Sequence, residues 1–125
     1  MTKKIWIVDD DKLYTLLLTK TIRKISANAI IDNFANGEEA IVALKNSGNL
    51  PDLIFLDINM PIMDGWEFLN AYIDLKKTMA QNIHIYAVSS SINNSDREKA
   101  LRFHEIAEYL IKPIKNEKLV EMLGL

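Results

Sequence analysis

The sequence predicts an α/β fold, a doubly wound parallel sheet with helices on both faces. Short apolar runs alternate with longer segments in which apolar residues recur at helical spacing. No repeat, linker or low-complexity tract interrupts this alternation. Strands that alternate with helices favour a parallel sheet, and right-handed crossovers place helices on both of its faces. A chain of 125 residues is the length of one domain.

Five apolar runs are the expected strands. The run Ile5–Val8 is rich in residues that favour strands and stops at three aspartates. The run Leu53–Leu56 is continuously apolar, which is typical of a strand covered on both faces. The remaining strands are expected at Ala29–Ile31, Ile83–Val88 and Tyr109–Ile111.

Start signals precede the expected helices. A polar residue followed by glutamate three positions later, the spacing of a capping box, occurs at Asn36, Asp64 and Ser95. The first helix is expected over Lys12–Ile25 and the last over Asn116–Leu123. The apolar residues expected on the fourth helix are Ala100, Leu101 and Phe103.

Composition excludes several classes of protein. The chain has no cysteine, which excludes a disulfide scaffold, a zinc–thiolate site and a cysteine nucleophile. Its 15 basic and 17 acidic residues give a net charge of −2, which argues against direct binding of nucleic acid. No apolar stretch is long enough for a signal peptide or membrane insertion, so we expect a cytoplasmic protein.

Charged and hydroxyl side chains gather where the expected strands end. In doubly wound sheets, ligands bind beyond the carboxyl ends of the strands. Helix capping, a solvated turn or a surface position explains each of these residues taken singly, but not all of them together. We therefore expect one functional site. The residues are Asp9, Asp10, Asp11, Asp57, Ser89 and Lys112.

This set of side chains points to phosphoryl transfer. Clustered carboxylates repel one another unless they share a cation, and oxygen ligands suit Mg²⁺. With the charge balanced, Asp57 can attack phosphorus as a nucleophile and form an acyl phosphate. Lys112 and Ser89 supply an ammonium and a hydroxyl for the phosphoryl oxygens. No glycine-rich phosphate loop is present, so nucleotide binding has no support.

Four segments carry a longer pattern. They are Ile7–Asp10, Leu56–Gly65, Val88–Ser89 and Tyr109–Pro113. In these segments the sequence resembles the receiver domains of two-component response regulators, and the spacing agrees along nearly the whole chain. The resemblance implies a receiver domain over residues 1–125, with a flavodoxin-like fold in the strand order 2-1-3-4-5.

The resemblance also implies roles for the residues of the site. Asp57 corresponds to the phosphoacceptor. Asp10 is implied as a direct Mg²⁺ ligand and Asp9 as a ligand through water, together with Asp57 and the backbone carbonyl of Asn59. Lys112 is implied to pair with the phosphoryl oxygens.

A conformational switch is implied as well. Ser89 matches the hydroxyl residue that moves toward the phosphoryl group, and Tyr109 matches the aromatic residue that changes rotamer with it. Pro113 is expected to follow a cis peptide bond. Asn59 and Ser91 stand at positions that tune how fast the phosphoryl group is lost to water.

The implied partners are proteins. A sensor histidine kinase or a phosphotransfer protein donates the phosphoryl group, and Leu13 and Tyr14 are expected exposed residues for its docking. The chain ends at Leu125 without an output domain, so we expect a downstream protein target or a longer parent protein. The face built by the fourth helix, the fifth strand and the fifth helix is the implied output face, on a monomer or weak dimer.

Three residues depart from the family pattern near that face. Glu105 and Ile106 stand where the family often has glycine and alanine. Ile114 stands after the Lys–Pro pair, where an aromatic residue is common.

Two other functions are considered. An aspartyl-phosphate phosphatase of the haloacid-dehalogenase type needs a second aspartate two residues after the nucleophile, where Asn59 stands. A binding module that is never phosphorylated would not need the intact acidic site. His84 and His104 are expected in structural or surface roles, and Lys76 and Lys77 at a solvated helix end.

Overall fold

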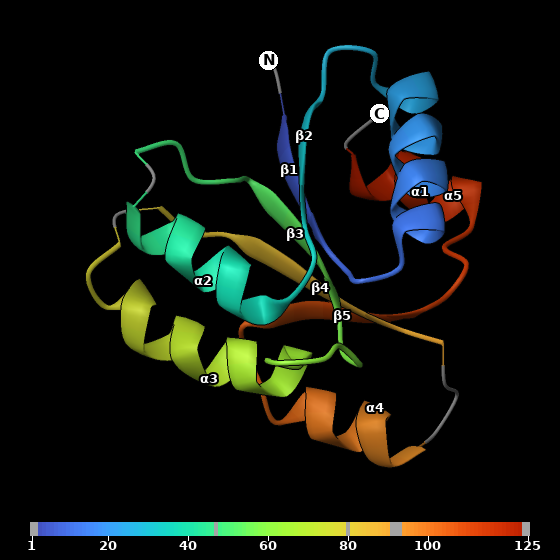
Figure 1. Cartoon of the computed structure of the whole chain (residues 1–125). Helices are drawn as coiled ribbons and strands as arrows, with labels where there is room; N and C mark the ends of the chain where they lie inside the picture. The colour runs from blue at the N-terminus through green and yellow to red at the C-terminus, as the bar shows by residue number, and fades with distance from the viewer. Residues whose placement is uncertain (1–2, 47, 80, 91–93, 124–125) are drawn as a thin grey trace.

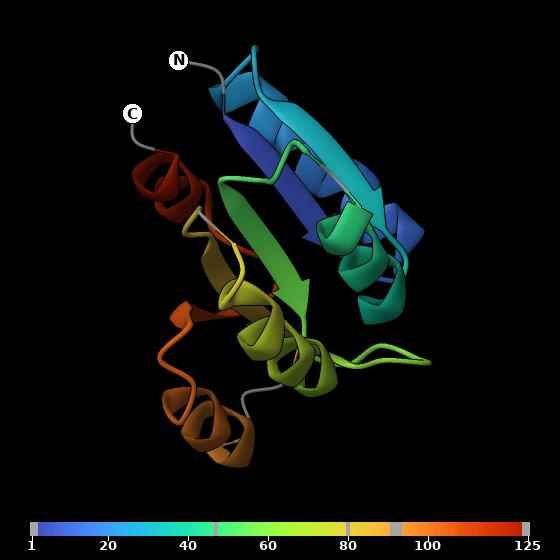
Figure 2. The ribbon, with the colours of Figure 1, turned by 90° about the vertical axis from the view of Figure 1, so that its left-hand side faces the viewer.

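A single parallel sheet organises the computed structural model, which describes residues 3–46, 48–79, 81–90 and 94–123. The strand order is β2-β1-β3-β4-β5, which confirms the expected doubly wound, flavodoxin-like topology. The arrowheads of β1, β2 and β3 point the same way in Figure 2. The strands are β1 (Lys4–Val8), β2 (Ile30–Phe34), β3 (Leu53–Asp57), β4 (His84–Ser89) and β5 (Ile106–Ile111).

Helices cover both faces of the sheet (Figure 1). Helices α1 and α5 pack on one face, and α2, α3 and α4 pack on the other. Among the described residues, no helix combines the length and apolar character needed to cross a bilayer. The helices are α1 (Lys12–Ile25), α2 (Gly37–Asn46), α3 (Gly65–Lys76), α4 (Asn94–Leu101) and α5 (Asn116–Met122).

The central strand β3 is buried along its whole length, as its continuous apolar sequence predicts. The two edge strands differ from the predicted bounds. β2 starts one residue later than expected and extends to Phe34, and β5 starts three residues earlier, at Ile106. An edge strand pairs on one side only, so it tolerates polar residues such as Asn33 and Glu108. These polar residues interrupt the apolar runs from which the strands are predicted.

Side-chain caps fix where the helices begin. Asp11 accepts a hydrogen bond from the backbone N–H of Tyr14 at 3.0 Å, so one of the three successive aspartates serves as a helix cap. Asp64 and Glu67 form the predicted reciprocal capping box at the start of α3. Helix α4 starts at residue 94, so Ser95, the predicted cap, lies inside the helix.

Helix α4 is held by cations over aromatic rings. The guanidinium carbon of Arg97 lies 5.4 Å from the ring centroid of Tyr109, and Nζ of Lys99 lies 5.0 Å from that of Trp66. Leu101, expected with the apolar residues of this helix, is 82% exposed. The helix is too polar to form an apolar stripe, so it packs through the buried Ala100 and through the side chains of Arg97 and Lys99.

Candidate functional site

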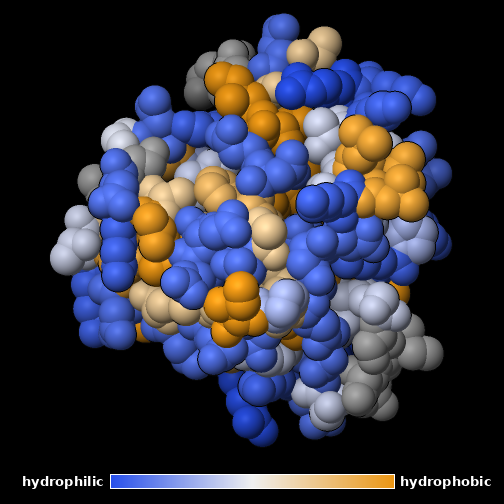
Figure 3. Space-filling view, viewed as in Figure 1, coloured by the Kyte–Doolittle hydropathy of each residue, from blue (hydrophilic) through white to orange (hydrophobic). Residues whose placement is uncertain are grey.

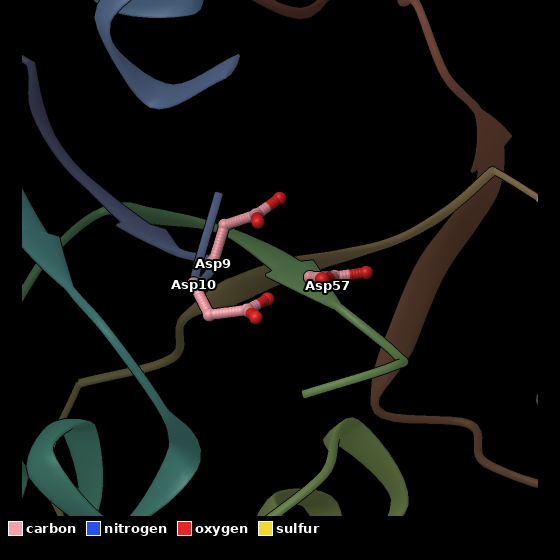
Figure 4. Close-up of side chains that lie close together, drawn as sticks. All are labelled: Asp9, Asp10 and Asp57. Atoms are coloured by element: carbon pink, nitrogen blue, oxygen red, sulfur yellow. The ribbon is translucent and has the colours of Figure 1, made fainter. Parts of the chain in front are cut away.

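Three carboxylates meet at the carboxyl edge of the sheet. Asp9 and Asp10 follow β1, and Asp57 ends β3, with their carboxylates extending to the same side in Figure 4. Because β1 and β3 are parallel neighbours, their ends lie side by side. Carboxylate oxygens of the three residues lie within 4.8 Å of one another. The structure therefore brings together side chains that are 47 positions apart in the sequence (57 − 10).

Backbone N–H groups orient two of these carboxylates. The N–H of Asp11 donates to Oδ1 of Asp9 at 2.9 Å, and the N–H of Asn59 donates to Oδ1 of Asp57 at 3.3 Å. Asp9 and Asp57 are buried, whereas Asp10 is exposed. The site thus has two fixed carboxylates at its base and a third at its mouth.

The charged form of the buried Asp57 carboxylate is disfavoured by its surroundings. The pKa of Asp57 is raised to about 6, first by burial, which removes solvent from the carboxylate, and then by the negative charge of Asp9. The Lys112 ammonium and the hydrogen bond from the Asn59 N–H lower the pKa of Asp57, but they do not cancel the rise. Three carboxylates face one ammonium, so the residues present fit an oxygen-coordinated divalent cation such as Mg²⁺.

Lys112 enters the site from the end of β5. Its Nζ lies 2.8 Å from Oδ2 of Asp9 and 3.7 Å from Oδ2 of Asp57, so Asp9 is its nearer partner. The backbone N–H of Lys112 donates to the carbonyl of Ser89 at 2.8 Å, which ties the ends of β4 and β5 together. The Lys112–Pro113 peptide bond is cis, as predicted.

The two residues of the predicted switch lie on these same strands. Ser89 is fully buried at the end of β4, one residue beyond Val88, which pairs with Asp57. Tyr109 lies on β5, half-buried beneath Arg97 of α4. The site and the α4 surface are therefore connected through neighbouring strands.

Comparisons with known proteins agree with this geometry. Residues 5–124 match the response regulator receiver domain. The chain belongs to this family. Receiver domains of this kind are signalling domains of two-component systems rather than enzymes that turn over an external substrate. They bind Mg²⁺ at an acidic site.

Individual relatives of this receiver domain are similar along most of its length. The sensor histidine kinase CheAY of Helicobacter pylori is 28% identical over 93% of the chain and 14% of the relative. A two-component response regulator from Cytophaga hutchinsonii has a TM-score of 0.86 at 27% identity, covering 97% of this chain and 93% of that one. The phosphorylated cyanobacterial phytochrome response regulator RcpA has a TM-score of 0.80 at 29% identity, covering 98% and 89%. The chain spans less than half the length of the curated relatives that it matches first.

The loop from β3 to α3 of this receiver domain closes tightly behind Asp57. The N–H of Gly65 donates to the carbonyl of Ile58 at 3.0 Å. A Cβ atom on Gly65 would lie 2.8 Å from Cα of Ile58 and 2.9 Å from the carbonyl oxygen of Asp57. Only glycine allows this approach, so Gly65 supports the position of Asp57.

The sequence did not reveal all of the contacts around this site. Tyr14 was expected to be an exposed docking residue, but it is half-buried with its ring facing Lys112. Lys76, expected at a solvated helix end, pairs with the half-buried Glu105 at 2.9 Å. Both differences arise because the partner comes from a distant segment, for which local patterns give no signal. Ser91, predicted to tune phosphoryl loss, lies outside the described residues.

His84 and His104 lie apart from the acidic site. Both are exposed, and Nε2 of His104 lies 3.0 Å from Oε2 of Glu105. They lie at the amino ends of β4 and β5, where they line a cavity of about 260 Å³ together with Tyr72 and Lys76.

Proposed function

We propose that this receiver domain, residues 1–125, is a phosphoacceptor in a two-component phosphorelay and that Asp57 carries the phosphoryl group. The observation that carries the proposal is the position of Asp57, which is 5% exposed, beside Asp9 and Asp10 and within 3.7 Å of Lys112. The donor is the phosphohistidine of a sensor histidine kinase or of a phosphotransfer protein. Similarity to the sensor histidine kinase CheAY supports this class of partner.

The proposed Mg²⁺ ligands are Asp10 directly, Asp9 through water, Asp57 and the backbone carbonyl of Asn59. When bound, the cation neutralises the carboxylates and the phosphoryl oxygens that approach them. Asp9 holds its orientation through the N–H of Asp11, and Asp57 holds its own through the N–H of Asn59. The bond from Asn59 keeps the Asp57 carboxylate in place before the donor arrives, and the bond from Asp11 keeps the neighbouring Asp9 carboxylate beside it.

The proposed transfer is a single displacement at phosphorus. An Asp57 carboxylate oxygen forms a bond to phosphorus while the P–N bond to the donor imidazole breaks, and its electron pair returns to the imidazole nitrogen. Lys112 moves its ammonium from Asp9 toward a phosphoryl oxygen, a short displacement given its present distances of 2.8 Å from Asp9 and 3.7 Å from Asp57. Water later attacks the acyl phosphate, releasing phosphate and restoring the carboxylate, at a rate tuned by Asn59 and Ser91.

The proposed response is a rearrangement of the α4–β5–α5 face. Ser89 turns its hydroxyl toward the phosphoryl group, and Tyr109 changes rotamer into the space that Ser89 leaves. Tyr109 contacts Arg97, so movement of its ring changes the packing of α4. A downstream protein target reads this face, on a chain that acts as a monomer or weak dimer without direct contact to nucleic acid.

The proposed docking surface for the phosphodonor is the exposed side of α1. Leu13 is 66% exposed, and Leu16 and Leu17 are exposed beside it. Figure 3 shows apolar side chains gathered over α1, surrounded by hydrophilic surface. This helix starts directly after the acidic residues, so a partner bound to it reaches Asp57.

The test is incubation with acetyl phosphate and Mg²⁺ followed by measurement of the intact mass. We expect one phosphoryl adduct per chain, which is absent in Asp57→Asn and after chelation with EDTA. Asp11→Asn is the matched control, because asparagine caps a helix as well as aspartate does and the adduct should persist. Catalytic release of phosphate from small esters would instead support the phosphatase, and no adduct with any donor would refute the assignment of Asp57.

A further inference from the structure

The aromatic ring of Tyr14 lies against the ammonium group of the site. Nζ of Lys112 is 4.3 Å from the centroid of this ring, the shortest of the three cation–ring distances recorded among the described residues. Tyr14 belongs to the first turn of α1, and its backbone N–H donates to the capping carboxylate of Asp11 at 3.0 Å. The cap that starts the helix therefore also fixes where the ring stands.

Lys112 is enclosed on three sides. Its side chain is 16% exposed, with Asp9 at 2.8 Å, Asp57 at 3.7 Å and the Tyr14 ring as the third neighbour. The face of an aromatic ring attracts a cation, more strongly when water is excluded. A lysine side chain has a flexible stem, so a third contact restricts the positions that its ammonium samples.

The hydroxyl of Tyr14 does not explain its position. It is buried without a hydrogen-bond partner among the described residues. Burial and the nearby charges of Asp9 and Asp57 raise the pKa of Tyr14, so the phenol stays neutral at ordinary pH. The ring lines a small cavity with Pro113 and Ile114, the residues that follow Lys112. Ring packing, and not a hydrogen bond, thus joins Tyr14 to the end of β5.

We propose that Tyr14 is a positioning residue, whose ring holds the Lys112 ammonium at the Asp9–Asp57 edge where phosphoryl oxygens arrive. The contact itself is a property of the unphosphorylated protein. Its kinetic consequence rests on the proposed function, because Lys112 then acts on the phosphoryl group carried by Asp57. A cation–π contact to a shielded ammonium corresponds to about a 5-fold to 30-fold change in a rate or equilibrium constant.

Nuclear magnetic resonance of the unphosphorylated protein tests the contact without any phosphodonor. The ring current of Tyr14 should shift the methylene protons next to Nζ of Lys112 upfield. We expect Tyr14→Phe to keep this shift and Tyr14→Met, which has an apolar side chain but no ring, to lose it. An unshifted Lys112 in the unmodified protein, or a shift that survives Tyr14→Met, would overturn the proposal.

Phosphorylation by acetyl phosphate in the presence of Mg²⁺ tests the consequence. Tyr14→Met should be phosphorylated about 5-fold to 30-fold more slowly, and Tyr14→Phe within about 2-fold of the unmodified rate. A normal rate in Tyr14→Met refutes the positioning role, as does an equal loss in Tyr14→Phe, which would assign the effect to the hydroxyl. If Tyr14→Met does not fold, Tyr14→Leu takes its place. If the unmodified protein takes no phosphoryl group, the proposed function fails, while the Lys112 resonances still decide whether the ring holds the ammonium.

Discussion

Replacing Gly65 by alanine puts a methyl group where the backbone behind Asp57 already stands. The added Cβ would lie 2.8 Å from both Cα and Cδ1 of Ile58 and 2.9 Å from the carbonyl oxygen of Asp57. Two of these three atoms belong to the backbone, which cannot move aside as the end of a flexible side chain can. The clash must therefore be relieved by shifting the end of β3 or the start of α3.

The expected loss of stability is about 2 kcal/mol, since overpacking of this kind typically costs 1–3 kcal/mol and alanine returns part of it through its better helix propensity. For a domain of this size that loss lowers the melting temperature by roughly 6–10 °C. The rate of phosphorylation should fall by about 10-fold or more, because Gly65 supports the carbonyl of the reacting residue.

Urea unfolding and acetyl phosphate labelling measure the two effects. Gly48→Ala is the matched control, because an added Cβ at Gly48 meets no atom within 4 Å. We expect that variant to stay within about 0.5 kcal/mol of the unmodified protein. Equal stability and labelling of Gly65→Ala and Gly48→Ala would refute the claim that close approach at Gly65 positions Asp57.

Three further predictions concern charge and strain. In the folded chain the pKa of Asp57 is raised to about 6, so the contribution of this residue to stability is greatest at low pH and is lost as the pH rises from about 4 to about 6. Without Mg²⁺, Asp57→Asn should stabilise the protein against urea by about 3 kcal/mol at pH 7 and by much less at pH 4. An equal gain at both pH values would contradict this sign. Lys76→Met should lower the free energy of unfolding by about 1–2 kcal/mol, because the side chain of Glu105, its partner, is 4% exposed while Lys76 itself is 34% exposed. Lys77→Met, which breaks only an exposed pair, should cost less than about 0.5 kcal/mol, and similar losses in the two variants would count against a stabilising Lys76–Glu105 pair. Ile62 has a φ of 70°, which is unfavourable for a β-branched residue, and its side chain is 74% exposed. Ile62→Asn should therefore raise the free energy of unfolding in urea by about 1 kcal/mol. A lower free energy of unfolding would show instead that packing of the Ile62 side chain stabilises the protein.

The order of strands and helices was predictable because it depends on local patterns. The buried strand Leu53–Asp57 and the capping box at Asp64 are visible in the sequence and form as expected. The same holds for the convergence of Asp9, Asp10 and Asp57, since the carboxyl ends of neighbouring parallel strands share one edge. Apolar runs indicate central strands better than edge strands, because edge strands contain polar residues, and the predicted ranges of β2 and β5 are therefore too short.

Contacts between distant side chains were not predictable in this way. Lys76 and Glu105 are 29 residues apart, and nothing near either one indicates that they form a pair. Leu101 was expected with apolar residues, yet α4 leaves it exposed because Ala100 and the cationic residues make the contacts with the sheet and α3. Such outcomes depend on the angle and depth at which a helix packs, and these are set by the whole core.

The sequence alone thus determined the fold, the family and the set of charged residues at the carboxyl edge, because each of these follows from the spacing of residue types along the chain. The tertiary structure decided how those charges are balanced. It shows that Lys112 lies nearer to Asp9 than to Asp57 and that the Tyr14 ring closes its third side. Distances of this kind arise only when α1, β1, β3 and β5 pack together, since α1 carries the ring, Asp9 and Asp57 stand at the ends of β1 and β3, and the lysine follows β5.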